Sequence, residues 1–279
     1  MKTDALSKTG ALLKTQALPT YKWERYTLAQ RLGRFLAYLA AVLVVSWALV
    51  RVDIHWPWAW DAPAQILDQF QRMYPPDWAV LPRVLQSLLE TVNIAIIATF
   101  LSVLMAVPVA FISARNTTPH PILWWLGRLI LVATRSVNTI VWALLFVAIF
   151  GPGVVAGICA IAFRSIGFLG KLIGEAIEES DPRPVEAMTA TGASRAKVIL
   201  YAIVPQVLPT FYAVTILRWD INIRESTVLG LVGAGGIGMI LSSAVDFLAW
   251  QQAAVILICI LGVVVLGELV SGWLRRRVL

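Results

Sequence analysis

The chain has 279 residues, of which 59% are hydrophobic and only 14% charged, and its formal net charge is +7. Soluble domains carry about 25% charged residues, so this composition excludes a soluble globular protein and predicts an all-α, polytopic membrane protein. The basic residues flank apolar runs, which is typical of membrane topology and argues against a nucleic acid partner.

The first 34 residues are polar, and the first apolar run predicts a membrane span near 33–50. This run lacks the small-residue cleavage site of a signal peptide, so we expect it to stay in the membrane. We therefore divide the chain into a basic, cytoplasmic segment, 1–32, and a transmembrane domain, 33–279. The next thirty or so residues hold several Pro and Trp and predict an external loop, because proline breaks long helices.

Further apolar runs predict five more spans, for about six in all. They lie near 84–112, 122–150, 154–179, 198–222 and 252–272. The sequence "GPG" at 151–153 predicts a tight turn. The stretch 223–251 is too interrupted by glycine to be assigned as a simple span or as a re-entrant segment.

The distribution of basic residues predicts the orientation. Fourteen Lys and Arg lie in 1–34, 113–120, 181–197 and 275–277, whereas the external loop holds three. The positive-inside rule then places both termini and the segment 180–197 in the cytoplasm, with the spans in a membrane of lipid.

The polar segment 180–197 predicts two helices joined by a turn. Asp181 suits an N-cap, and a short helix can run from it to Thr191. Gly192 is the expected left-handed stop, and Ser194 can cap the next helix. So short a helix needs a surface on which to dock.

The spacing of Glu, Gly and Pro here resembles the cytoplasmic "EAA" loop of permease subunits in bacterial ABC importers. The resemblance implies that this loop is a coupling helix, which binds in a groove of the ATP-binding subunit. The residues that it assigns to coupling are Glu186, Ala187, Met188, Gly192, Ala193 and Pro205. Met188 departs from the pattern, which has alanine there, without changing charge or helix propensity.

Three stretches resemble the permease of phosphonate-type importers: "RSVNTIVWALLF" (135–146), "ATGA" (190–193) and "RWDINIRESTVLGLVGAGGIG" (218–238). The resemblance implies a type I ABC importer permease fold in the bacterial inner membrane. Its expected partners are a second copy of the chain, two ATP-binding subunits and a periplasmic substrate-binding protein. The implied cargo is phosphonate, phosphite, hypophosphite or phosphate. We expect no cofactor in this chain and no enzymatic activity, because ATP and Mg would bind to the partner ATPase.

The stretch "VGAGGIG" (232–238) matches the dinucleotide-binding fingerprint G-x-G-x-x-G. That fingerprint needs a βαβ unit, which an all-helical protein does not offer, so we interpret the match as accidental. Glycine instead permits close helix packing or irregular backbone lining a path, and both alternatives stay open. The residues assigned to a gate or pathway are Gly230, Gly233, Gly235, Gly236, Gly238 and Thr227.

Charged residues inside apolar spans suggest function. Arg218, Asn222 and Glu225 share one predicted helix face, and Asp220 with Arg224 has the spacing of a helical ion pair. Arg135 with Asn138 predicts a second polar patch. The residues that we expect to line the substrate path or to form ion pairs in the bundle are Arg135, Asn138, Arg164, Arg218, Asn222 and Arg224.

Two other functional classes are considered. An ion-gradient-driven secondary transporter often shows inverted repeats, and we find no convincing repeat. An intramembrane enzyme needs a nucleophile–base or metal constellation. We expect no catalytic residues and no metal site, because His55 and His120 lack partners at ligand spacing.

Overall fold

The computed structural model describes residues 26–52 and 56–278. The chain divides into two compact units, residues 1–64 and 65–279. Most of the predicted basic segment 1–32 lies outside the described residues, as does His55. Helix α2 (Leu28–Arg51) contains the first predicted span, and none of its residues is buried. At 1.5 Å per residue its 24 residues are long enough to cross a bilayer core of about 30 Å.

The prediction that residues 51–83 form only a loop is wrong. Helix α3 (Trp56–Met73) occupies most of this segment and contains Pro63. A proline removes one backbone hydrogen bond but does not forbid a helix whose other turns are intact. The apolar side chains of Ile66, Leu67 and Phe70 recur at helical spacing and are exposed, so α3 has one continuous apolar face.

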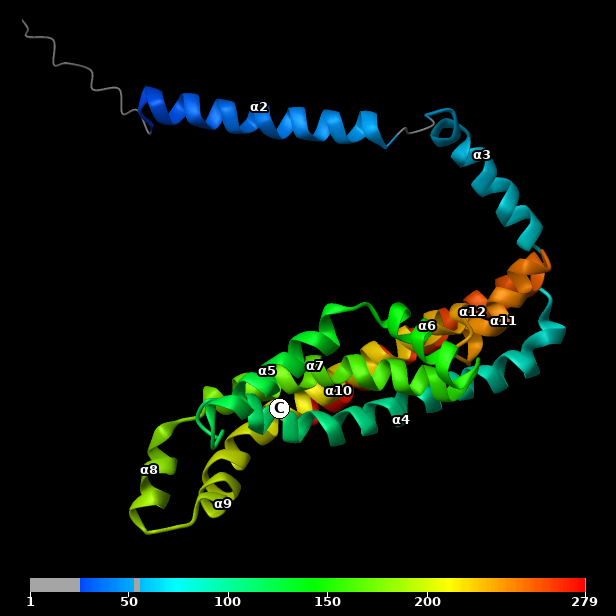
Figure 1. The fold of residues 1–279 in the computed structure, drawn as a ribbon. Coiled ribbons are helices and arrows are strands. Elements are labelled where there is room, and N and C mark those ends of the chain that lie inside the picture. Colours follow the sequence, from blue (N-terminus) through cyan, green and yellow to red (C-terminus); the bar gives the residue numbers. More distant parts are fainter. Residues whose placement is uncertain (1–25, 53–55, 279) are drawn as a thin grey trace, which may run out of the picture. The chain divides into compact units, whose positions relative to one another are not determined.

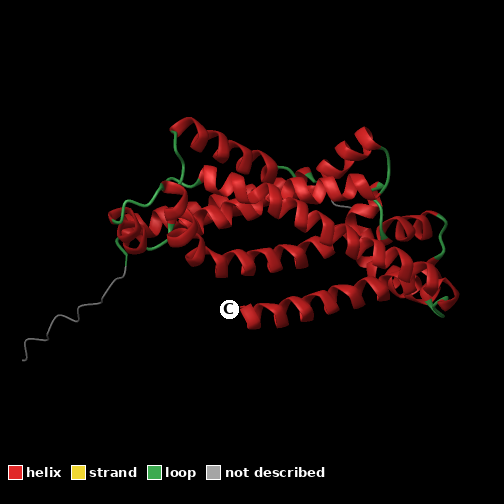
Figure 2. Cartoon of the chain, turned by 90° about the horizontal axis from the view of Figure 1, so that it is seen from below, coloured by secondary structure: helices red, strands yellow, loops and turns green. Residues whose placement is uncertain are grey.

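The second unit is a bundle of long helices joined by short elements (Figures 1 and 2). The long helices are α4 (Leu81–Ser113), α5 (Pro121–Ser136), α6 (Thr139–Phe150), α7 (Val154–Glu178), α10 (Val204–Leu229) and α12 (Trp250–Val278). The short elements are η1 (Trp78–Val80), α8 (Pro182–Ala190), α9 (Arg195–Val198), the π-helical turn η2 (Ile199–Ile203), η3 (Gly230–Val232) and α11 (Ile237–Asp246). Helices α4 and α7 pack most extensively, and α5, α6 and α10 also contact α7.

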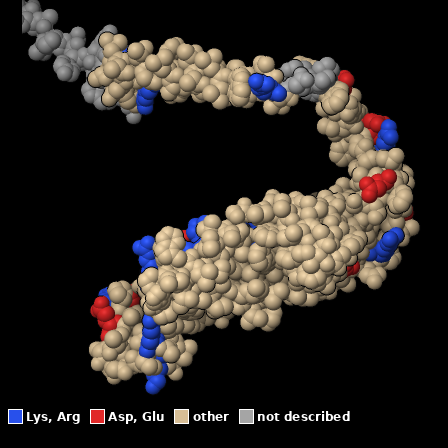
Figure 3. All heavy atoms as spheres, viewed as in Figure 1, with Lys and Arg blue, Asp and Glu red and all other residues tan. Residues whose placement is uncertain are grey.

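The expectation of an all-α membrane protein with about six spans is confirmed. Five of the described helices are long and apolar enough to cross a membrane, and counting the bent pair α5–α6 as one span gives six. Residues 26–52 and 56–278 contain no strand. On the visible face of the second unit, charged side chains gather mainly at its two ends (Figure 3). An uncharged band lies between these ends, as a bilayer requires.

The predicted single span 122–150 is wrong in one respect, because α5 and α6 meet at an angle of 92°. Val137 and Asn138 have extended backbone at the break, and the side-chain oxygen of Asn138 accepts a 3.2 Å hydrogen bond from the Ile140 N–H. Asn competes with the helix by capping the backbone, so α6 begins anew at this residue.

The stretch 223–251, left unassigned from sequence, is neither a simple span nor part of a loop. Helix α10 extends seven residues beyond its predicted end at 222, to Leu229, and a turn at 233–236 then leads into the ten-residue helix α11. A helix of ten residues is too short to cross a bilayer.

The turn 233–236 lies against α7 at a point that only glycine can occupy. A Cβ added to Gly157 would lie 2.3 Å from the Ala234 carbonyl oxygen. The Gly153 N–H donates a 2.8 Å hydrogen bond to the Gly233 carbonyl beside this contact. The close approach therefore joins the start of α7 to the turn that follows η3.

We predict that Gly157→Ala destabilises the protein by about 1–3 kcal/mol, because the added methyl group must push two backbones apart. Thermal unfolding of the purified chain in detergent measures the change. Gly262→Ala on α12 is the matched control, since its Cβ would meet nothing within 4 Å. Equal melting temperatures for the two variants would contradict the prediction.

Candidate functional site

The elbow formed by α8 and α9 has the predicted turn, but Ser194 at the N-cap of α9 makes no side-chain capping hydrogen bond. The Asp181 carboxylate accepts a 3.0 Å hydrogen bond from the Arg183 N–H at the start of α8. Gly192 has φ +74°, in the left-handed region. The Arg183 side chain, and then its backbone N–H, hold the pKa of Asp181 below its ordinary value. The cap is therefore ionised at neutral pH, which suits a helix N-terminus.

One face of α8 packs inward and the other is free of the bundle. Val185 packs against the hydrophobic core, whereas the next two residues, Glu186 and Ala187, are exposed. Met188 and Ala193 are half-buried, and Pro205 is exposed in the first turn of α10. The residues assigned to coupling therefore lie in the elbow, except for Pro205, which lies at the start of α10.

Polar contacts tie the elbow to the bundle. The Gln206 side chain on α10 accepts a 2.8 Å hydrogen bond from the Asp181 N–H. Arg195 donates a 2.7 Å hydrogen bond to the Thr117 carbonyl, in the turn that follows α4. These bonds join the N-cap of α8 to α10, and the first residue of α9 to the turn that follows α4.

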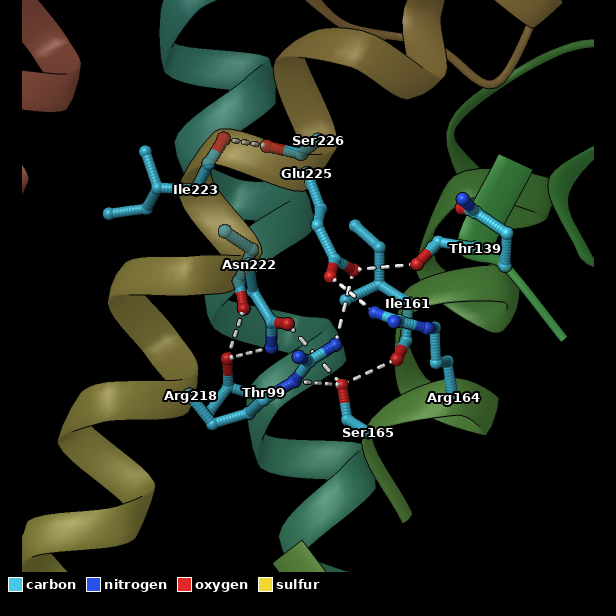
Figure 4. Close-up of polar contacts among 12 residues, drawn as sticks. Thr99, Thr139, Ile161, Arg164, Ser165, Arg218, Asn222, Ile223, Glu225 and Ser226 are labelled. Atoms are coloured by element: carbon cyan, nitrogen blue, oxygen red, sulfur yellow. Dashed lines mark hydrogen bonds and ion pairs between the residues drawn. The ribbon is translucent and has the colours of Figure 1, made fainter. Parts of the chain in front are cut away.

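The interior of the bundle holds an ionic cluster around Glu225 (Figure 4). Its carboxylate accepts hydrogen bonds from Arg164 on α7 at 2.7 Å, from Arg218 on α10 at 3.1 Å and from the Thr139 hydroxyl on α6 at 3.0 Å. The Arg218 side chain is 2% exposed, against 31% for Arg164 and 19% for Glu225. One carboxylate therefore holds three helices together.

A second layer of hydrogen bonds surrounds the cluster. The Arg218 Nε donates to the Ser165 hydroxyl at 2.8 Å, and the Asn222 amide donates to the Thr99 hydroxyl at 2.8 Å. The shared face of Arg218, Asn222 and Glu225 is confirmed. The partners Thr99 and Ser165 were missed, because a Ser or Thr in an apolar helix commonly bonds its own backbone and carries no distinct signal.

The predicted helical ion pair between Asp220 and Arg224 is confirmed. The Asp220 side chain is 9% exposed and the Arg224 side chain is 49% exposed, so the pair extends from the interior to the surface. An open hollow of about 360 Å³ lies where Arg224, Arg164 and Glu225 meet the N-terminus of α6. Asn138 and Thr139 line the same hollow.

The predicted polar patch of Arg135 with Asn138 is wrong. The helix breaks between the two residues, so their spacing does not place them on one face. Arg135 is exposed and lines a different hollow, with Arg128 and Lys171. Asn138 is instead the N-cap of α6.

The glycines show both irregular backbone and close packing, at different positions. Gly233, Gly235 and Gly236 have φ between +74° and +85°, so they supply irregular backbone. Gly230 and Gly238 provide close packing, since a Cβ on Gly230 would lie 2.5 Å from the Gly238 Cα.

The glycine turn is anchored to its neighbours by polar contacts. The Glu90 carboxylate on α4 accepts a 3.1 Å hydrogen bond from the Gly236 N–H, and the Thr91 hydroxyl accepts one of 2.8 Å from the Ile237 N–H. The Thr227 hydroxyl bonds the Arg224 carbonyl at 2.7 Å within α10. Glu90 was not predicted, because its partner is a backbone group 146 residues away.

Comparison with known proteins gives consistent results. The family described as "Binding-protein-dependent transport system inner membrane component" matches residues 106–279. The chain is 42% identical over 203 residues to the phosphite transport system permease protein PtxC of Stutzerimonas stutzeri. The aligned region covers 73% of this chain and 74% of that protein. It is 36% identical over 253 residues to the phosphate-import permease protein PhnE of Mycolicibacterium smegmatis, covering 90% of this chain and 47% of that relative. The chain thus spans about half the length of this second relative.

Among solved structures, the inward-facing MetNI methionine ABC transporter is similar in fold. It has a TM-score of 0.62 at 19% identity and covers 73% of this chain and 99% of that one. The expected permease fold and the resemblance to phosphonate-type permeases are confirmed.

We predict that Glu225→Gln lowers the stability of the bundle by roughly 3 kcal/mol, because it leaves the buried Arg218 without a carboxylate. Thermal unfolding in detergent measures the loss. The matched control is Glu175→Gln, which breaks the 3.4 Å pair with Lys171 where both side chains are nearly half exposed. That variant should lose less than about 1 kcal/mol. The prediction fails if Glu225→Gln unfolds at the temperature of the control.

Proposed function

Because the chain belongs to the family of binding-protein-dependent transport system inner membrane components, we propose that it is the permease subunit of an ABC importer that passes a phosphorus oxyanion into the cytoplasm. One observation carries the proposal. The exposed helix α8 is tied through Gln206 to α10, the helix that holds the buried ion pair of Arg218 and Glu225.

The proposal requires partners. Two ATP-binding subunits, each with its own ATP and Mg, would receive the elbow 180–197 of each of two copies of this chain. A periplasmic substrate-binding protein would deliver the cargo on the other side. The chain itself would be no enzyme, since hydrolysis belongs to the ATP-binding subunits.

The coupling follows from the contacts of the elbow. Glu186 and Ala187 would meet the ATP-binding subunit, and Gly192 would set the angle between α8 and α9. Movement of α8 would pass through Gln206 to α10 and then to the glycine turn at its other end. Closure of the ATP-binding subunits would in this way change the far end of the bundle.

The glycine turn is the proposed gate or wall of the pathway. Gly233, Gly235 and Gly236 adopt a backbone that other residues rarely adopt, and irregular backbone at membrane depth belongs where it lines a cavity or is buried in protein. Glu90 and Thr91 would hold this turn in the state seen here.

The cargo is inferred from similar proteins. Relatives with 36–42% identity are named for phosphite or phosphate transport. Phosphite, phosphonate, hypophosphite and phosphate share a tetrahedral phosphorus with anionic oxygens, which guanidinium groups suit geometrically. We assign the choice among them to the binding protein, because a pathway that binds its cargo tightly also traps it.

The main alternative is a secondary transporter driven by an ion gradient. The break between α5 and α6 is a feature that this class shares. The exposed elbow has no role in such a protein, whereas it matches the needs of coupling to an ATPase. Co-purification of an ATP-binding subunit with the chain distinguishes the two functions.

We predict that Gly192→Val abolishes uptake of phosphite by the whole complex, because a β-branched residue is strongly disfavoured at φ +74°. Gly192→Asn is the control and should retain most of the uptake, since Asn tolerates the left-handed region. Glu186→Lys, which reverses a charge on the exposed face, should also abolish uptake. Normal uptake in both the Val and the Lys variants would show that the elbow is only a connector.

We further predict the orientation in the bacterial inner membrane, with both termini in the cytoplasm. A membrane-impermeant thiol reagent added from outside should label cysteine introduced at Asp61 or Asp68, both exposed on α3. It should not label cysteine at Ser194 in the elbow. The opposite labelling pattern would reverse the topology and refute import through this chain.

A further inference from the structure

We propose that the hollow between α6, α7 and α10 is a transit site for the oxyanion, with Arg164 and Arg224 as its cationic groups. This inference rests on the proposed function and adds a location within the membrane. The hollow, about 360 Å³ in volume, is lined by both arginines, by Asn138 and Thr139 at the start of α6, and by Glu225.

The charges around the hollow do not balance. Arg164 and Arg218 share the single carboxylate of Glu225, at 2.7 and 3.1 Å. Asp220 neutralises only Arg224. The five ionised groups therefore leave one excess positive charge. Uncompensated charge inside a membrane bundle is costly, and a passing anion is the partner that would neutralise it.

Hydrogen-bond donors are also left over. The Nε of Arg164 is buried and has no hydrogen-bond partner within the part of the chain that the structure describes. Half of the Arg224 side chain is exposed beside the hollow. Guanidinium groups bind oxyanions with fixed geometry, so the exposed parts of Arg224 and Arg164 fit tetrahedral phosphorus with several oxygens.

The break in the α5–α6 pair adds a third feature that would attract an anion, after the excess charge and the free donors. It places the N-terminus of the twelve-residue helix α6 at the wall of the hollow. The positive end of a helix dipole favours negative charge, and transporters direct the ends of broken helices toward anionic groups at membrane depth. A continuous helix through 137–138 would have no terminus here.

The position of Arg164 along α7, and the competition between Glu225 and an anion for its guanidinium group, suit a site that the anion passes through rather than one that retains it. Arg164 is ten residues into the 25-residue helix α7, about 15 Å along its axis. An anion that enters can take the place of Glu225 at Arg164, while Glu225 keeps its bond to Arg218. When the anion leaves, Glu225 returns to Arg164. This exchange keeps binding weak enough for release.

The test changes the charge of the hollow without removing the cap of α6. Asn138→Asp keeps an equally good N-cap but cancels the excess positive charge, whereas Asn138→Ser keeps a neutral cap. The full complex, with its ATP-binding subunits and binding protein, is reconstituted in liposomes, and uptake of phosphite and of phosphate is measured. The Asp variant should transport roughly tenfold more slowly than the Ser variant, because a unit charge now opposes the anion at close range.

Arg164→Gln provides an independent variant, since it leaves Arg218 and Glu225 as a balanced pair. Uptake should again fall roughly tenfold, the effect of removing a nearby unit charge. Lys171→Gln on the same helix removes a positive charge away from the hollow and should leave uptake unchanged. Co-purification of the ATP-binding subunit reports assembly for every variant.

The outcomes separate the two proposals. Equal uptake by the Asp and Ser variants, or normal uptake by Arg164→Gln, would overturn the transit site while import continues. Equal loss in Arg164→Gln and Lys171→Gln would also overturn it, because the effect would not depend on the hollow. Failure of the wild-type complex to take up any of phosphite, phosphate, hypophosphite and a phosphonate would refute the proposed function itself.

Discussion

The ion pairs and hydrogen bonds of the Glu225 carboxylate are the interactions on which the helix packing of the second unit depends. Its carboxylate joins α6, α7 and α10 through Thr139, Arg164 and Arg218, and the last of these is 2% exposed. Taking such a cation out of water is expensive unless a carboxylate and further acceptors satisfy it. Ser165 supplies one more acceptor, and Asn222 bonds Thr99 beside it. The cluster therefore constrains where α10 can lie relative to α4 and α7.

Helix α10 connects the two ends of the proposed mechanism. At one end Gln206 bonds the start of α8, and at the other the helix passes through η3 into the glycine turn. Two contacts hold that turn: Gly157 on α7 lies close to Ala234, and the Gly236 N–H donates a hydrogen bond to Glu90 on α4. In the proposed mechanism, α10 would carry a movement from the elbow toward this turn.

The break between α5 and α6 costs backbone hydrogen bonds but creates a helix N-terminus within the span. It interrupts backbone hydrogen bonding within an apolar span, where unsatisfied groups are expensive, and Asn138 compensates by capping Ile140. The new terminus lies beside Arg164 and Arg224. In the proposed transit site, this helix terminus is one of the groups that would attract the anion.

Local features were predictable from the sequence, and long-range contacts were not. Hydropathy determined the spans, and the elbow followed from Asp181 and Gly192, because capping and positive φ depend on near neighbours. The pair of Asp220 with Arg224 followed from helical spacing. The break at 137–138 was missed, since apolar runs lie on both sides of it and the polar residues Arg135 and Asn138 between them were assigned to one face of a continuous helix. Only the tertiary structure brought Glu225 to Arg164, 61 residues away, and Glu90 to Gly236. Those contacts depend on how whole helices pack, a relation that no short stretch of sequence encodes.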